Sequence, residues 1–141
     1  MNNININNET RLLSFSEEMK KKIEYLIDSS FFMNYEKEIY KKIFNDPEIS
    51  FESLQELLEI VENSINKNLE FVVDNEEFQQ INLKMYNDVM STLEEYNKYN
   101  SNYQRNGLKI PKNELLSKAN YIEDYINILY EYKINIRKYY L

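Results

Sequence analysis

The hydrophobic residues of this chain recur at steps of three and four, which is the spacing of α-helices that bury one face. The clearest stripe follows Ser50, whose hydroxyl can accept hydrogen bonds from the first turn of a helix. That stripe consists of Phe51, Leu54, Leu57, Leu58, Val61 and Ile65. The opposite side is predicted to be a solvated acidic ridge, formed by Glu52, Glu56, Glu59 and Glu62.

A second pattern, over residues 75–99, predicts the most buried helix of the fold. Asp74 and Glu77 have the D-x-x-E spacing of a capping box, which satisfies free amides at the start of a helix. One apolar stripe contains Phe78, Ile81, Met85, Val89 and Tyr96, and a second contains Leu83, Tyr86, Met90 and Leu93. Because a helix with two apolar faces should be covered from two sides, we predict that the other helices pack around residues 75–99.

Three further stripes predict helices over residues 14–27, 34–44 and 113–136. Each begins with a residue type that caps helices, namely Ser14, Asn34 and Asn113. Phe31 and Phe32 close the first of these helices, and they could be either core residues or an exposed anchor.

Two stretches are predicted to lie outside the helices. Residues 1–8 are polar and of low complexity, so we expect a flexible start. Residues 97–113 form the longest stretch without a clear stripe, and they contain the only glycine, Gly107, and also Pro111. A loop of this length inside a compact domain is unusual, so we expect it to be either functional or mobile.

The composition agrees with a single helical domain. The chain has 141 residues, of which 43% are hydrophobic, with one glycine and two prolines. Folds rich in strands and tight turns need glycine and proline at their corners, so the scarcity of both favours long helices. We therefore predict one all-α domain over residues 1–141, a compact bundle of about five helices around the central helix at 75–99.

The chain contains neither cysteine nor histidine. This excludes disulfides, thiolate nucleophiles, zinc–thiolate sites and the usual general base near neutral pH. A single glycine excludes a phosphate-cradling loop, and the paired carboxylates are expected on solvated faces, so we predict no enzyme activity, no metal and no cofactor. Because no apolar run is long enough to span a membrane and no secretory signal is present, we expect a soluble, intracellular protein of the cytoplasm.

Charge is unevenly distributed along the chain. Residues 46–96 carry thirteen acidic and two basic side chains, a net charge of −11, whereas residues 97–141 have a net charge of +4. A negative surface formed by residues 46–96 would attract a protein partner with a basic surface, or another copy of the chain in a homodimer, and it would repel nucleic acid. The candidate binding residues are Glu52, Glu56, Glu59, Asp74, Glu76 and Glu77. Tyr99 and Tyr103 join them, because tyrosine is apolar along its ring and polar at its tip.

Two segments resemble a known family. EIYKKIFNDPEISFESLQELLEIVENS is similar to the second-helix region of the poxvirus Bcl-2-like proteins that blunt innate immune signalling. NELLSKANYIEDYINILYEYKINIRKYYL is similar to their terminal helices. The resemblance implies an all-α fold with residues 75–99 at its centre and a host protein as partner. Small helical bacteriocin-immunity proteins and phage anti-defence proteins have the same general pattern.

The leading hypothesis is a non-enzymatic protein-interaction module, an inhibitor or adaptor that a virus or mobile element directs at a host defence or signalling protein. Heavy use of Asn, Lys, Ile and Tyr fits this origin, because it is typical of AT-rich genomes such as those of many phages, poxviruses, clostridia and protists. The alternatives are a structural subunit of a larger assembly, a bacteriocin-immunity-type protein, and a small enzyme that uses carboxylates or tyrosines. A pocket that gathers two or more buried carboxylates would favour the enzyme, and an exposed charged or apolar face would favour the binding module. A large apolar patch on a monomer would favour the subunit.

Overall fold

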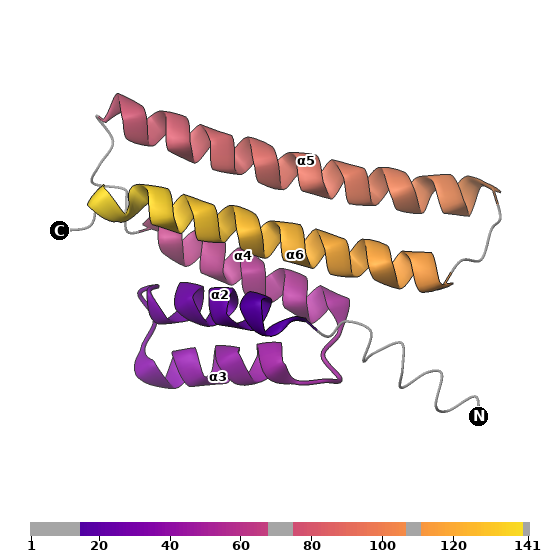
Figure 1. The fold of residues 1–141 in the computed structure, drawn as a ribbon, viewed down its shortest axis with the longest axis horizontal. Coiled ribbons are helices and arrows are strands. Elements are labelled where there is room, and N and C mark those ends of the chain that lie inside the picture. Colours follow the sequence, from indigo (N-terminus) through magenta and orange to yellow (C-terminus); the bar gives the residue numbers. More distant parts are fainter. Residues whose placement is uncertain (1–14, 68–74, 107–110, 140–141) are drawn as a thin grey trace.

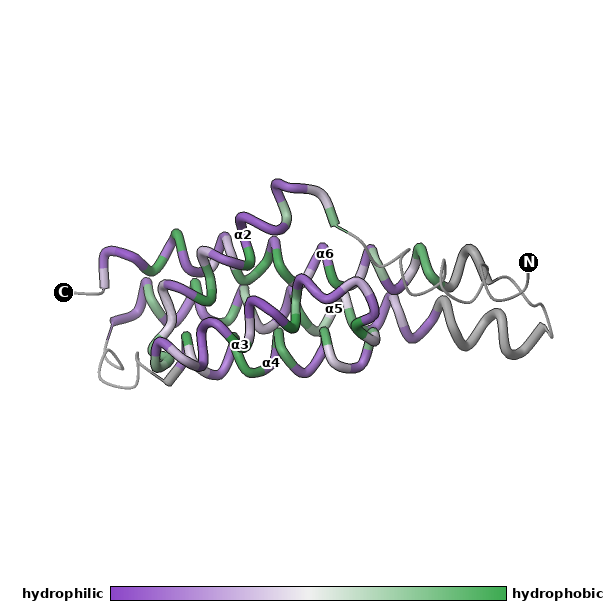
Figure 2. The backbone as a smooth tube through the Cα atoms, turned by 90° about the horizontal axis from the view of Figure 1, so that it is seen from below, coloured by the Kyte–Doolittle hydropathy of each residue, from purple (hydrophilic) through white to green (hydrophobic). Residues whose placement is uncertain are grey.

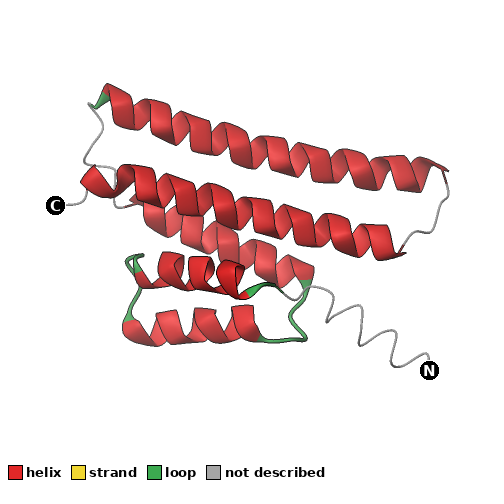
Figure 3. Cartoon of the chain, viewed as in Figure 1, coloured by secondary structure: helices red, strands yellow, loops and turns green. Residues whose placement is uncertain are grey.

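A computed structural model of the protein describes residues 15–67, 75–106 and 111–139, with side chains for 15–66, 75–98 and 115–139 (Figure 1). These residues form five α-helices and one short 3-10 turn, and they include no strand (Figure 3). The elements are α2 (Glu17–Asp28), α3 (Asn34–Asn45), α4 (Phe51–Lys67), α5 (Glu76–Asn106), α6 (Pro111–Ile136) and η1 (Arg137–Tyr139). The predicted all-α bundle of about five helices is confirmed.

The helices alternate in direction along the chain (Figure 1). α4 and α6 therefore run parallel to each other, and α5 runs antiparallel to both. α6 lies at the centre of the bundle, because it packs against α2, α4 and α5, whereas α3 packs against α2 and α4. α5 packs chiefly against α6 and forms one side of the bundle (Figure 1).

The prediction that residues 75–99 form the central helix is wrong. That segment belongs to α5, whose described side chains are buried at Phe78 and Met85 alone. Leu83, Tyr86 and Met90 of its second apolar stripe stay exposed, whereas Leu93 is partly buried against the core, so this helix is covered mainly from one side. α6 takes the central place because its buried residues face several neighbouring helices. They are Tyr121, Ile122, Tyr125, Ile126, Leu129, Tyr132, Lys133 and Ile136.

The apolar stripe predicted after Ser50 is confirmed. All of its residues are buried in α4, and they pack with Ile23, Leu26 and Ile27 of α2 in one hydrophobic core. Figure 2 shows hydrophobic positions returning at helical intervals along the tube. Burial of each large apolar side chain contributes about 1.5–3 kcal/mol. Most of the buried apolar side chains belong to α2, α4 and α6, so these helices supply most of the core. None of the described helices is both long and apolar enough to cross a membrane.

Polar side chains cap three of the helices. Ser50 accepts a hydrogen bond from the amide three residues further on at 3.1 Å, as predicted for α4. α2 is capped by Ser16 instead of Ser14, with 3.2 Å between the hydroxyl oxygen and the amide nitrogen. α5 is capped by Asn75 instead of Asp74, at 3.0 Å. Two predicted caps that the structure replaces, Ser14 and Asp74, lie outside the described residues, and a third, Asn34, is the first helical residue of α3, whose N-cap is Met33.

The long loop predicted over residues 97–113 is wrong for most of its length, because α5 continues to Asn106 and α6 begins at Pro111. Residues 97–106 contain neither glycine nor proline, so nothing in them interrupts the backbone hydrogen bonds of a helix. In the sequence, Asn106 is followed by Gly107, a residue type that commonly follows a helix, and Pro111 begins α6, where proline fits the first helical turn. The flexible start predicted at residues 1–8 lies outside the described residues.

Candidate protein-interaction surface

The acidic ridge predicted on α4 is present for three of its four carboxylates. Glu52, Glu56 and Glu59 are exposed on the solvent side of the helix. No salt bridge joins any of the three to another described residue. Three uncompensated negative charges on one helix face produce a local negative potential that reaches into the solvent.

Glu62, predicted to belong to this ridge, is half-buried against α6. Its Oε1 accepts a hydrogen bond from the Tyr125 hydroxyl at 2.6 Å. Burial raises the pKa of the Glu62 carboxyl, and the hydrogen bond from Tyr125 opposes that rise only in part. Glu62 follows Leu58 by four residues and so lies near the buried edge of α4, which the pattern of acidic residues alone did not reveal.

A row of tyrosines from α6 meets polar side chains of α4, and we call Tyr121, Tyr125 and Tyr132 the tyrosine ladder. Gln55 donates to the Tyr121 hydroxyl oxygen at 3.3 Å, and the Tyr132 hydroxyl lies 3.0 Å from Oδ1 of Asn66. Because α4 and α6 run parallel, the partners follow one another in the same order along both helices. Sequence analysis missed the ladder, although its signal is visible as polar positions and tyrosines that recur at one- and two-turn intervals.

The ladder also connects α4 and α6 to α5. The Tyr132 hydroxyl lies 3.0 Å from Oδ1 of Asn82, and Nδ2 of Asn66 donates to the Tyr86 hydroxyl oxygen at 3.0 Å. Hydrogen bonds between neutral groups contribute about 0.5–1.5 kcal/mol each, and they specify how the helices align. The polar side chains of this seam therefore hold α5 in register with its neighbours.

Replacing Glu62 with glutamine is expected to raise the melting temperature at neutral pH. Because the folded state raises the pKa of this carboxyl above 4.5, it holds the proton more tightly than the unfolded state. Protonation of Glu62 therefore stabilises the folded state. This stabilisation is complete below the pKa of Glu62 in the unfolded state and is lost as the pH rises through its pKa in the folded state. Glutamine has no charge to desolvate and can still accept from Tyr125. Thermal unfolding followed by circular dichroism should show an advantage of Glu62→Gln at neutral pH that disappears below pH 4.5.

The matched control for this prediction is Tyr125→Phe, which removes the hydrogen bond and leaves the carboxylate in place. It should lower the free energy of unfolding by about 1–2 kcal/mol at neutral pH, because Glu62 loses its donor. Equal destabilisation by Glu62→Gln and Tyr125→Phe would contradict the prediction, since it would mean that the folded state favours the charged form of Glu62.

The carboxylates at the start of α5 do not join the ridge. Glu76 and Glu77 are exposed, but they begin α5 at the end of the bundle where α4 ends, whereas Glu52 lies in the first turn of α4, toward the opposite end (Figure 1). α4 has 17 residues and is therefore about 25 Å long. Glu77 is also paired with Lys138 of η1, whose hydrogen bond and positive charge lower the pKa of Glu77. The predicted acidic set is thus divided between two ends of the bundle.

Three of the predicted binding residues are not placed by the structure. Asp74 lies outside the described residues. Tyr99 and Tyr103 belong to α5, in a part of the helix whose side chains are not described. The role of these three residues in partner binding stays a prediction.

An apolar stripe on α5, which the described residues leave exposed, lies next to α4. Leu83, Tyr86 and Met90 expose 53%, 43% and 53% of their surfaces. The hydrogen bond between Tyr86 and Asn66 joins the stripe to α4, and burial and the nearby charge of Glu62 raise the pKa of Tyr86. We call the ridge and the stripe together the α4–α5 face, which comprises Glu52, Glu56, Glu59, Leu83, Tyr86 and Met90.

A second group of apolar side chains is exposed where α2 connects to α3, and we call it the α2–α3 corner. It consists of Phe31, Met33, Tyr35 and Ile39, which expose 68%, 65%, 67% and 49% of their surfaces. Phe32 instead packs edge-on against Tyr40, with ring centroids 4.8 Å apart. The phenylalanine pair therefore divides, with one exposed ring and one ring at the edge of the core. α3 and α5 lie on opposite sides of the bundle, so the corner and the α4–α5 face are separate surfaces (Figure 1).

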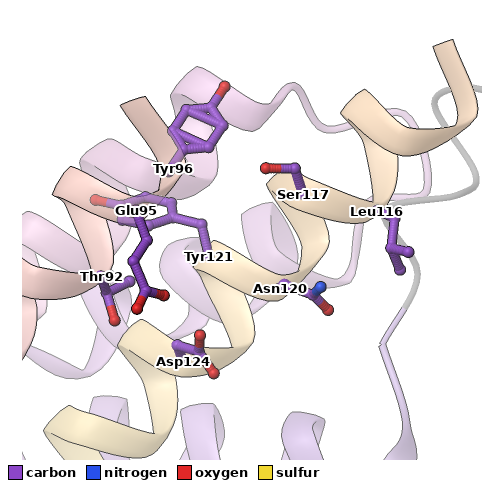
Figure 4. A pocket seen from close by; sticks show the side chains of 8 residues that line it. All are labelled: Thr92, Glu95, Tyr96, Leu116, Ser117, Asn120, Tyr121 and Asp124. Atoms are coloured by element: carbon purple, nitrogen blue, oxygen red, sulfur yellow. The ribbon is translucent and has the colours of Figure 1, made fainter. Parts of the chain in front are cut away.

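A pocket of about 220 Å³ lies between α5 and α6 (Figure 4). Residues that line it include Thr92, Glu95 and Tyr96 of α5 and Ser117, Tyr121 and Asp124 of α6. Glu95 and Asp124 are both exposed, so this pocket does not gather the buried carboxylates that would favour an enzyme. Partial desolvation of the exposed Asp124 carboxyl raises its pKa, and the negative charge of Glu95 raises it further. The described residues include no cluster of three acidic side chains that could hold a metal ion.

No protein-family model, curated protein or solved structure matched this chain. The resemblance to the poxvirus Bcl-2-like proteins therefore stays a prediction. Function has to be argued from the surfaces themselves, which are the α4–α5 face, the α2–α3 corner and the pocket between α5 and α6.

Proposed function

We propose that the protein is a non-enzymatic protein-interaction module whose α4–α5 face binds a partner with a basic and partly apolar surface. The observation that carries this proposal is the uncovered apolar stripe of α5 beside the exposed carboxylates of α4. An amphipathic helix gains stability when its apolar stripe is covered, and the described part of the chain leaves this stripe open. A partner protein would supply the missing cover.

The two halves of the face would make different contributions to binding. Leu83, Tyr86 and Met90 follow one another at helical spacing, so an elongated element of the partner can lie along them. Tyrosine and methionine are enriched at interfaces because both present large, adaptable apolar surfaces. The ridge would attract lysine and arginine side chains before contact and fix their register after it.

The two helices that carry the α4–α5 face are long enough for an interface to extend beyond its six residues. Interfaces of standard size bury roughly 800 Å² on each partner. α4 has 17 residues and α5 has 31, which correspond to lengths of about 25 Å and about 46 Å. Two neighbouring helices of these lengths offer room for a partner helix and its flanking residues.

For the biological role, we propose an inhibitor or adaptor that is encoded by a virus or mobile element and acts on a host defence or signalling protein. Residue usage typical of an AT-rich genome supports this origin, as does the resemblance of two segments to the poxvirus Bcl-2-like family. Such a module would act by occupying the basic surface of its target, so its activity would depend on complementarity and not on catalytic groups.

The decisive experiment compares wild-type protein with Leu83→Ser/Met90→Ser as bait in extracts of the cells in which the protein is naturally made. Wild-type bait should capture a partner, identified by mass spectrometry, that the double variant loses. With the purified partner, the variant should raise the dissociation constant about tenfold to a hundredfold, because truncating interface anchors typically costs more than 1 kcal/mol each.

The matched control is Phe31→Ser/Met33→Ser, which makes the same kind of change at the α2–α3 corner. Both side chains are exposed there, so this variant should fold and capture the partner as wild type does. If the corner variant loses the partner while Leu83→Ser/Met90→Ser retains it, the α4–α5 face is not the binding site and the corner is.

A further inference from the structure

The pocket between α5 and α6 lies apart from the α4–α5 face. Successive residues of a helix are rotated by about 100°, so Glu95 points about 140° around α5 from Met90. The pocket opens along the seam between α5 and α6, at residues that do not contribute to the apolar stripe. Its chemistry can therefore be considered, and tested, independently of the proposed partner interface.

Two carboxylates face the same space in this pocket. Figure 4 shows the side chains of Glu95, from α5, and Asp124, from α6, directed toward each other. Neither forms a salt bridge with a described basic residue, and the charge of Glu95 adds to burial in raising the pKa of Asp124. Two like charges held close together repel each other, and a cation between them would relieve that repulsion.

Aromatic rings form another wall of the pocket. Tyr96 stacks on Tyr121 with ring centroids 5.3 Å apart, and Phe51 of α4 packs against both rings. Tyr121 is buried, and Gln55 holds its hydroxyl, so its ring is a fixed surface. Apolar side chains at a pocket wall accept the alkyl stems that carry ammonium and guanidinium groups.

From these features we propose that the pocket binds an organic cation, a primary ammonium or guanidinium group on an alkyl stem. The charged head would lie between Glu95 and Asp124, and the alkyl stem would lie against the other lining side chains, Tyr96 and Leu116. The hydroxyl of Thr92, which lies one turn before Glu95 on α5 and also lines the pocket, can accept a remaining N–H group. A volume of about 220 Å³ is below the roughly 300–1,000 Å³ of sites for drug-sized ligands, so it suits a single side chain or a short amine.

A divalent metal ion fits this pocket less well than an organic cation does. Calcium takes about six to eight oxygen ligands, and magnesium requires near-octahedral geometry. The described residues include no group of three or more side chains that could hold such an ion. Aromatic walls add nothing to the binding of a hydrated metal ion, whereas they stabilise an alkylammonium ion directly.

The test is a titration of ¹⁵N-labelled protein with n-butylammonium, followed by amide chemical shifts. The expected result is a millimolar dissociation constant with the largest shifts at residues 92–96 and 116–124, and no such shifts with n-butanol, a neutral analogue. Asp124→Asn and Glu95→Gln should each weaken binding about threefold to tenfold, because each removes one charge from a partly solvated ion pair. Circular dichroism establishes that each variant is folded.

The matched control is Glu94→Gln, which removes a neighbouring exposed carboxylate of α5 that does not line the pocket. Butylammonium should bind this variant as it binds wild type. The proposal is overturned if butylammonium shifts no pocket amides, or if n-butanol shifts them equally. It is also overturned if Glu94→Gln weakens binding as much as Asp124→Asn, since the cation would then respond to a diffuse acidic surface.

Two further ligands identify the source of the cation. Tighter binding of spermidine would point to a free polyamine, and tighter binding of a lysine residue capped at both ends would point to a side chain of another protein. Either result supports the pocket and assigns its ligand. Leu83→Ser/Met90→Ser should bind butylammonium as wild type does, so loss of the protein partner and loss of the cation remain distinguishable.

Discussion

Replacing Ile126 with alanine is expected to lower the free energy of unfolding by about 3 kcal/mol, a large part of the roughly 5–15 kcal/mol typical of a domain. Ile126 is fully buried on α6, the helix that packs against α2, α4 and α5. The loss combines the transfer free energy of the deleted carbons with the cavity that they leave. Urea denaturation should show a lower midpoint with an unchanged slope, because the two states remain the same.

The matched control is Met90→Ala on α5. Met90 is 53% exposed, and alanine is a good helix former, so this change should stay within about 0.5 kcal/mol of wild type. If Ile126→Ala and Met90→Ala destabilised the protein equally, α5 would contribute to the core as much as α6 does. That result would contradict the central position of α6.

The contrast between α4 and α5 shows what an apolar pattern can predict. In α4 a single stripe identified every buried position from Phe51 to Ile65, because a helix with one apolar stripe buries one face only. In α5 the second stripe indicated a surface that favours cover, but a pattern does not say whether the same chain provides it. Leu83 and Met90 are therefore exposed although their spacing equals that of a buried face.

The central position of α6 was harder to predict because tyrosines form part of its buried surface. Tyr121, Tyr125 and Tyr132 bury their rings and bond their hydroxyls to side chains of α4 or α5. Tyrosine fits both core edges and interfaces, so composition alone does not assign it to either. Only the parallel alignment of α4 and α6 brings these tyrosines to their polar partners.

Local composition also misled the interpretation of residues 97–113. Asparagine and tyrosine are modest helix formers, costing up to about 0.7 kcal/mol per residue relative to alanine, and such residues resemble a loop when read alone. A helix that is already formed continues through them, because each added residue gains a backbone hydrogen bond. The first residue able to stop it by its own conformational preference is Gly107.

Some residues of the candidate sites could be predicted from local sequence patterns, whereas others depend on how the helices pack together. Glu52, Glu56 and Glu59 were predictable, since their exposure follows from the position of the α4 stripe. The pocket was not, because Glu95 and Asp124 are 29 residues apart in sequence and meet only through the antiparallel packing of α5 and α6. Sequence patterns describe single helices well, whereas sites that form between helices depend on their relative register.

Reversing the charge of the ridge should slow association with the partner and leave the fold unchanged. In Glu52→Lys/Glu56→Lys/Glu59→Lys, lysine replaces glutamate at exposed positions, and both residues are good helix formers, so helix content should be unchanged. Attraction toward a basic partner would become repulsion, and the association rate should fall about tenfold to a hundredfold at low salt. Stopped-flow or surface-binding kinetics with the captured partner would measure this rate directly.

Salt provides an internal check on this electrostatic explanation. Screening acts within about 8 Å at physiological ionic strength, so added salt should slow wild-type association and reduce the difference between wild type and variant. The matched control for the double variant Glu56→Lys/Glu59→Lys is Glu38→Lys/Glu131→Lys. The control makes the same change of net charge, but at exposed sites on α3 and α6. The second pair should slow association much less. If the ridge variants associate at the wild-type rate in low salt, the carboxylates of α4 only solvate the helix, and the apolar stripe of α5 must bind the partner without electrostatic steering.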